Sequence, residues 1–143
     1  MLKGYARLML FEETDKIAHR FSKDCNITYP EAVPVLWNFQ RSSPGDVLGT
    51  AFIKRDEKGL TCDVKLPNAP LLLADEKLGI GGFYCGIKTH DENGVTVIDK
   101  AILRAVSITL SPAHDEYRLF LYDDAAPIEV LEEEKNDERK NNR

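Results

Sequence analysis

The chain contains 143 residues, of which 43% are hydrophobic and 30% charged, and its 24 acidic and 19 basic residues give a net charge of −5. This composition is typical of one folded domain, and it argues against a general nucleic-acid binder, which would carry a basic surface. No apolar run approaches the roughly 20 residues that a membrane-spanning helix needs. The N-terminal residues are interrupted by Lys3 and Arg7 and do not match a signal peptide, so we expect a cytosolic protein.

Short apolar segments separated by turn residues predict a mainly β protein. Gly4–Phe11 is the first expected strand, and the polar segment Glu12–Asn26 after it is expected to be a long loop or one helical turn. Val33–Phe39 is β-branched and aromatic, and Pro34 within it predicts a strand that starts late or lies at a sheet edge. Serine, proline and glycine cluster in Arg41–Asp46 and predict a turn.

The middle of the chain predicts a β-hairpin. Val47–Arg55 and Leu60–Leu66 are the expected strands, and Lys58-Gly59 lies near the tip between them. Apolar and polar residues alternate in the second strand, and this period of two is typical of a half-buried strand. The positions expected to face solvent are Thr61, Asp63 and Lys65.

The second half of the chain predicts one helix and more strands. The strong helix formers of Leu71–Leu78 indicate a short helix of about two turns. A strand is expected at Phe83–Thr89, and Asn93-Gly94 is the dipeptide most typical of a tight hairpin turn. The remaining expected strands are Val95–Ile98, Ala101–Leu110 and Tyr117–Tyr122.

These elements predict a mainly β fold with minor α content: a small antiparallel β-barrel of six or seven strands with one or two short helices. Residues 1–122 are expected to form this single domain. Residues 123–143 are strongly charged and carry few apolar side chains, which cannot offset the entropy of ordering the chain. We expect them to be a disordered tail or a frayed helix.

The residue spacing contains no recognisable catalytic or metal site. The three cysteines have no C-x-x-C spacing, so we expect reduced, partly buried thiols and neither disulfides nor zinc. Cys85 has no evident base, since His90 lies five residues away along an expected strand. The histidines are scattered, and none is spaced as a metal ligand.

Three further features have a structural explanation that we favour over a functional one. The glycine-rich stretch Gly79–Gly86 lacks the lysine of a phosphate-binding loop and opens a strand, so we expect two backbones to approach closely there. Ser107 lies within an apolar strand and is expected to be buried and hydrogen-bonded. Trp37 is expected to anchor the core.

Five segments occur in an order that resembles a known family. They are Gly4-Tyr5-Ala6, Val33-Pro34-Val35-Leu36-Trp37, Leu48-Gly49-Thr50-Ala51 with Lys58-Gly59-Leu60, Ile80-x-Gly82-Phe83-x-x-Gly86, and Val106-Ser107-Ile108-Thr109-x-x-Pro112-Ala113. Together they span about Leu2–Tyr122 and resemble the prohead proteases of tailed bacteriophages. These are serine peptidases with a herpesvirus-assemblin-like fold that cut scaffold and capsid segments during capsid maturation.

The chain departs from this family at the positions that would carry the chemistry. The family's histidine after the tryptophan corresponds to Phe39, its nucleophilic serine to Tyr84, and its acidic residue before Val-Ser to Ala105. Phenylalanine cannot accept a proton, and a tyrosine phenol with a pKa near ~10 is a poor substitute for an activated serine. The resemblance therefore implies a member that lacks the catalytic residues.

The resemblance implies a catalytically inactive phage or prophage protein that binds capsid or scaffold protein during head assembly. It implies a place in the cytoplasm of the bacterial host or within the procapsid, and self-association as a homodimer or larger oligomer. With the composition, it predicts no cofactor, no metal, and neither a nucleic-acid nor a membrane partner. The binding candidates are Trp37, Phe39, Tyr84 and Cys85.

Two alternatives stay open. One is a still-active capsid-maturation peptidase that uses displaced residues, such as Cys85 with His19 or His114. The other is a small β-barrel binding module unrelated to proteolysis.

Overall fold

Strands make up most of the computed structural model, which describes residues 1–40 and 46–124. Within these residues it contains eight strands and one 3-10 helix. The strands are β1 (Leu2–Leu10), β2 (His19–Thr28), β3 (Ala32–Trp37), β4 (Gly49–Arg55), β5 (Gly59–Leu66), β6 (Leu78–Glu92), β7 (Val95–Thr109) and β8 (Arg118–Asp123), and the helix is η2 (Leu71–Asp75). No helix in this described part is long and apolar enough to cross a membrane.

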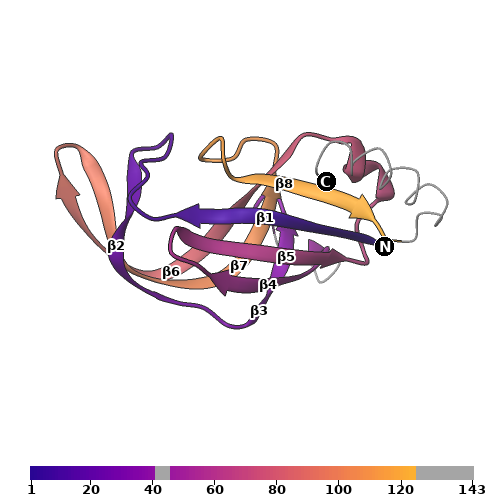
Figure 1. Cartoon of the computed structure of the whole chain (residues 1–143), viewed down its shortest axis with the longest axis horizontal. Coiled ribbons are helices and arrows are strands. Elements are labelled where there is room, and N and C mark those ends of the chain that lie inside the picture. Colours follow the sequence, from indigo (N-terminus) through magenta and orange to yellow (C-terminus); the bar gives the residue numbers. More distant parts are fainter. Residues whose placement is uncertain (41–45, 125–143) are drawn as a thin grey trace.

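Seven of the strands close into a barrel (Figure 1). The hydrogen-bonded order is β7-β3-β4-β5-β1-β8-β6, and β6 pairs with β7 again to complete the ring. The predicted mainly β barrel of six or seven strands is therefore confirmed. Two pairings are parallel, β3 with β7 and β2 with β7. β2 and β3 pair one after the other with the same edge of the long strand β7, and both run in its direction.

β2 corrects the expectation for residues 12–26. The sequence predicted a loop or helical turn there, but the chain is extended from His19 to Thr28 and pairs with β7. Most side chains of β2 are at least partly exposed, and only Cys25 and Ile27 are buried. Backbone pairing rather than side-chain burial holds this strand, so its sequence carries little of the usual alternation.

Pro34 lies at the point where β3 begins to pair with its second neighbour. It faces Thr50 of β4 in the antiparallel ladder, whereas pairing with β7 starts only at Val35. The missing N–H of proline therefore removes no described hydrogen bond to β7. The strand itself starts at Ala32, before the proline, and lies between β4 and β7, so the expected late start and edge position are both wrong.

Both predicted hairpins form. β4 and β5 are joined at Lys58-Gly59, and β6 and β7 at Asn93-Gly94, whose positive φ angles of 53° and 84° suit a tight hairpin turn. Several sequence boundaries shift: β6 starts at Leu78 and includes the glycine-rich stretch, and β7 joins two expected strands. The expected two-turn helix is the shorter η2, and residues 125–143 lie outside the described part, as does most of the expected turn at 41–46.

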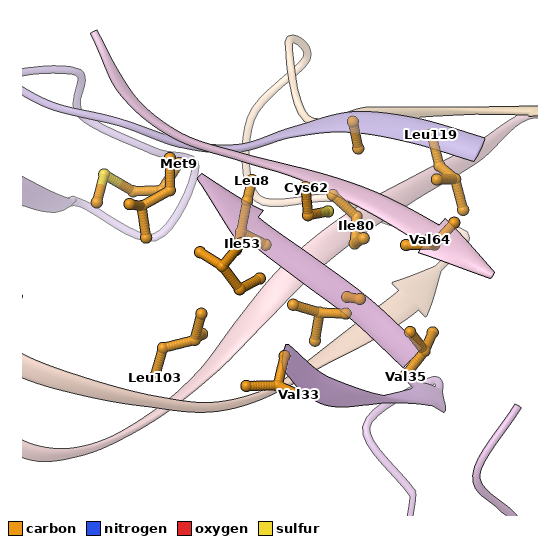
Figure 2. Packing of buried hydrophobic residues seen from close by; sticks show 14 of the residues in the cluster. Leu8, Met9, Val33, Val35, Ile53, Cys62, Val64, Ile80, Leu103 and Leu119 are labelled. Atoms are coloured by element: carbon orange, nitrogen blue, oxygen red, sulfur yellow. The ribbon is translucent and has the colours of Figure 1, made fainter. Parts of the chain in front are cut away.

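The interior of the barrel is filled by alternate side chains of all seven strands. Figure 2 shows Leu8, Ile53, Leu103 and their neighbours meeting in this space. Leu8 and Met9 are both buried although they are adjacent, because a register shift in β1 between Arg7 and Met9 changes which side chains face inward. Nearly complete burial of such leucine and isoleucine side chains contributes about 1.5–3 kcal/mol each.

Gly59 generates the first testable prediction. It has a φ of +154°, and a Cβ there would lie 2.0 Å from the carbonyl oxygen of Met9 on the neighbouring strand. Gly59→Ala is therefore expected to lower the free energy of unfolding by about 3 kcal/mol, measured by urea denaturation. Gly94→Ala is the control, since its φ of +84° is strained but no atom lies within 4 Å. Equal losses in both variants would contradict the steric explanation.

The far part of the β6–β7 hairpin projects from the barrel beside β2 (Figure 1) and contains a charged cluster. His90 Nδ1 lies 2.5 Å from a carboxylate oxygen of Asp99, and its Nε2 lies 3.2 Å from one of Glu92. Arg20 of β2 contacts the same Glu92 at 3.2 Å. Asp99, and after it Glu92, raise the pKa of His90 above its usual value of 6.5.

This cluster predicts that the stability of the β6–β7 hairpin depends on pH. A raised pKa means that the proton binds the folded hairpin more tightly, so the stabilisation is complete below about pH 6.5 and is lost as the pH rises through the raised pKa. After correction for intrinsic exchange rates, amide protons of the hairpin should lose protection over that range. His90→Gln should remove this pH dependence, and a variant that keeps it would contradict the assignment to His90.

Candidate functional site

The barrel is joined only briefly between β6 and β8. Residue pairs form there at Leu78 and Gly79, and one further bond runs from the Ile80 N–H to the Tyr117 carbonyl oxygen at 2.9 Å. Backbone groups alternate in direction along a strand, so the N–H and C=O of Gly82 point the same way as those of Ile80. Beyond Ile80, the described ladder pairs of β6 are all with β7. This side of β6 is an open strand edge.

A cavity of about 720 Å³ lies at this open edge. Its walls are the segment 15–21 that leads into β2, the part of β6 around Gly81 and Gly82, and residues 109–118 between β7 and β8. Lys16 N–H donates to the Ala113 carbonyl oxygen at 2.8 Å and so joins the first wall to the last. The main apolar lining residues are Ile17, Phe21, Phe39, Tyr84, Ile87 and Leu110.

Phe39 reaches the cavity from an unusual turn after β3. Asn38 and Phe39 both have positive φ, 49° and 59°, a conformation that is costly for a bulky residue. Two hydrogen bonds to β7 stabilise the turn. Phe39 N–H donates to Ser107 Oγ at 2.6 Å, and Asn38 N–H donates to the Ile108 carbonyl oxygen at 2.8 Å. Ser107 is fully buried, so the prediction of a buried, hydrogen-bonded serine is confirmed.

The Phe39 ring lies directly over Gly81. A Cβ built on Gly81 would be 2.8 Å from the ring atom Cζ, so a larger residue there would force the ring to shift. The Phe39 side chain is still 44% exposed and lines the cavity. The close backbone approach expected for the glycine-rich stretch is here an approach of backbone to an aromatic ring.

Tyr84 packs on the opposite face of β6, against Gly82. A Cβ on Gly82 would lie 2.4 Å from Cζ of the tyrosine ring, and the Phe21 ring is 5.1 Å away between centroids. The Tyr84 hydroxyl is buried and has no hydrogen-bond partner among the described residues. Burial raises the pKa of this phenol above its usual range, so the side chain stays neutral.

Ala105 lies beside the cavity and not in its lining. It pairs with Phe83 of β6 and is buried. A register shift follows immediately, because Leu103 pairs with Tyr84 and leaves Arg104 as an extra residue in β7. The structure thus brings Phe39 and Tyr84 to one cavity on two faces of β6, with Ala105 adjacent on β7.

The other two binding candidates lie outside the cavity lining. Trp37 is half-buried and packs against the core. Cys85 Sγ accepts a hydrogen bond from Arg104 Nε at 3.2 Å. Among the described residues, no hydrogen bond joins Cys85 to His19, which lines the cavity, or to His114.

The polar groups at the rim of the cavity are paired with one another. Lys16 Nζ lies 2.9 Å from Asp115 and lowers the pKa of that carboxyl group. The Asp15 carboxylate accepts the N–H groups of Ile17 and His19 at 3.0 and 2.9 Å. In the described part of the chain, no hydrogen bond links a cavity histidine to a hydroxyl or thiol. The arrangement suits binding by contact more than nucleophilic chemistry.

Thiols and carboxylates are not gathered for a metal ion. Residues 1–40 and 46–124 contain no group of three or more metal-ligating side chains. All three cysteines are free, and burial raises the pKa of Cys62 to about 12, which keeps it a neutral thiol.

Sequence reasoning missed the cavity walls. Segments 15–21 and 109–118 meet only in the folded chain, and their lining side chains follow no periodic pattern. The available signal was indirect: Gly81 and Gly82 indicated that something approaches β6 closely, but not what.

Comparison of the chain with models of protein families, with curated proteins and with solved structures finds no match.

The Phe39 turn generates a prediction about Ser107. Ser107→Ala removes the acceptor of the part-buried Phe39 N–H, and the net loss of such a hydrogen bond costs about 0.5–1.5 kcal/mol. We expect that loss in the free energy of unfolding, together with a changed emission spectrum of Trp37, the single tryptophan, two residues before Phe39. The exposed Ser111→Ala is the control. An unchanged Trp37 spectrum in Ser107→Ala would contradict the proposed role of the serine.

Proposed function

We propose that this chain is a catalytically inactive protein of the prohead-protease kind, encoded by a phage or prophage, that binds capsid or scaffold protein during head assembly. The resemblance of five ordered segments motivates the family. The closed, mainly β barrel is compatible with the assemblin-like fold that this family implies.

The observation that carries the proposal is the pair of aromatic rings, Phe39 and Tyr84, that pack against β6. The resemblance places the family's histidine and serine at Phe39 and Tyr84, and each ring packs against a glycine of β6, but on opposite faces of that strand. The two positions therefore do not face each other as a catalytic pair in this chain. Neither side chain can act as a general base at neutral pH. The nearby Ser107 hydroxyl is buried and already accepts the Phe39 N–H. Because members of a catalytic unit act together, losing even one removes most of the rate.

The open edge of β6 supports a binding role and suggests its form. A strand edge with unpaired N–H and C=O groups is a template for an added strand, which natural proteins normally cover or block. An extended segment of the partner protein would pair with the backbone at Gly82. Its alternate side chains would enter the apolar cavity beside Phe39 and Ile87.

The two alternatives have less support. An active peptidase built on Cys85 needs a base next to the thiol, whereas the described partner of Sγ is the guanidinium of Arg104. A binding module unrelated to proteolysis would use the same cavity with another partner, and it leaves the ordered resemblance unexplained.

The test uses the purified protein and the capsid and scaffold proteins encoded at the same locus. We expect binding without cleavage. Phe39→Ala should raise the dissociation constant, measured by calorimetry, about tenfold or more, as expected for the loss of an anchoring aromatic ring. The matched control is Phe83→Ala, since Phe83 is 47% exposed against 44% for Phe39 and does not line the cavity.

Three results would overturn the proposal. Specific cleavage that Cys85→Ala or Ser107→Ala abolishes would show an active peptidase. Absence of binding to both proteins would remove the head-assembly role, as would a locus without any virion gene. Equal effects of Phe39→Ala and Phe83→Ala would place binding away from the cavity.

A further inference from the structure

The outer face of four barrel strands has a composition unlike the rest of the chain. β8, β1, β5 and β4 lie side by side in this order (Figure 1) and are antiparallel throughout. Their inward side chains fill the core, and every second residue points outward. The outward positions are Arg118, Phe120 and Tyr122 on β8, Lys3, Tyr5 and Arg7 on β1, Thr61, Asp63 and Lys65 on β5, and Thr50, Phe52 and Lys54 on β4.

Three exposed aromatic rings are grouped at one side of this face. Tyr5 stands directly opposite Phe120 in the β1–β8 ladder, and Tyr122 follows two residues later on the same face. Their side chains are 47%, 65% and 57% exposed. Directly opposite residues of adjacent strands lie within about 5.5 Å of each other, so Tyr5 and Phe120 are neighbours on this face, with Tyr122 diagonal to Tyr5. None of the three belongs to the core or the cavity.

Cations surround these rings. Lys3 stands between Tyr122 of β8 and Lys65 of β5 in the ladder. Arg7 follows on the same face of β1, on the other side of Tyr5. On the whole face, five outward positions are lysine or arginine and only Asp63 is acidic. The complete chain carries a net charge of −5, so its acids are concentrated elsewhere.

The ion pairs of these cations involve mostly acids at the margin. Lys3 contacts Asp124 at 2.9 Å, just past the end of β8, and Arg7 contacts Asp56 at 2.7 Å in the β4–β5 turn. The Lys3 pair is exposed and contributes at most about 1 kcal/mol, so a phosphate can share or replace that carboxylate. The Arg7 pair is bidentate, with bonds of 2.9 and 2.7 Å, and the Arg7 side chain is only 17% exposed, so this guanidinium stays bound to Asp56. On the face itself, Lys54 lies 3.3 Å from Asp63. The Lys65 ammonium instead lies over the Phe52 ring, 5.5 Å from its centroid.

We propose that this aromatic and basic face binds single-stranded nucleic acid. Bases stack on Tyr5, Phe120 and Tyr122, and phosphates lie near the surrounding lysine and arginine side chains, the combination by which sheet surfaces hold single strands without sequence preference. The acidic composition predicts no nucleic-acid partner for the chain as a whole. The distribution of charge, rather than its total, favours one for this face.

The same features disfavour two other occupants. A duplex keeps its bases stacked inside and offers none to an exposed ring. A second copy docked through the same face would oppose five cations with five cations, which is unfavourable in a symmetric interface. The site is also independent of the proposed function, since Arg118 is its only residue that also lines the cavity.

The test measures fluorescence anisotropy of a labelled oligo(dT) of about 20 nucleotides, and of a duplex of equal length, at about 50 mM salt. The single strand should bind more tightly than the duplex. Phe120→Ala and Tyr122→Ala should each weaken its binding about tenfold. Phe83→Ala, an aromatic of similar exposure on β6, is the control and should leave the affinity unchanged.

The salt dependence gives a second readout. Each phosphate neutralised contributes a slope of about −0.7 in the logarithm of the affinity against the logarithm of salt concentration. Lys65→Gln should therefore reduce the slope by about 0.7, and Lys88→Gln on the β6–β7 hairpin should not change it.

Any of three outcomes would overturn the proposal. These are undetectable binding of the single strand at low salt, equal effects of the face variants and their controls, and a dimer in solution that Phe120→Ala dissociates. The last would identify the face as an interface between two copies of the chain.

Discussion

The short pairing between β6 and β8, which closes the barrel, determines where its open strand edge and its cavity lie. β6 has 15 residues and β8 has six, and they share pairs only at Leu78 and Gly79 before the two strands part. This pairing closes the ring of strands, yet it leaves most of one edge of β6 without a neighbouring strand. An open edge is normally a liability for aggregation. Here the segments 15–21 and 109–118 stand around it, and the space that they leave is the cavity.

The strand content of the barrel could be predicted from sequence because most strands carry their information locally. β5 alternates apolar and polar residues, and Asn93-Gly94 determines the turn of the β6–β7 hairpin. β2 could not be found in this way, since it is held by backbone bonds to β7 and buries only two of its side chains. The parallel pairings of β7 were equally hidden, because register between distant segments leaves no local pattern.

The candidate site was predictable only as a set of positions. The resemblance singled out Phe39, Tyr84 and Ala105, and the structure brings the first two to one cavity, whereas Ala105 pairs with Phe83 just outside its lining. The turn that carries Phe39 could not be foreseen, because its two positive φ angles depend on a hydrogen bond to Ser107, 68 residues further along the chain. The same serine, which is a possible nucleophile by residue type, acts here as the acceptor for that turn.

Net charge is a property of a chain, but binding depends on where the charges lie. The acids of this protein sit in turns, on the projecting hairpin and along the C-terminal residues, whereas the outer face of β8, β1, β5 and β4 carries one acid among five cations. Period-two alternation produces this separation, since the positions that cannot enter the core all point to one side. The barrel thus offers two chemically different surfaces: an apolar cavity beside a free backbone edge, and an aromatic, basic sheet face. The two proposed ligands, a polypeptide segment at the first surface and a single strand at the second, would therefore not displace each other.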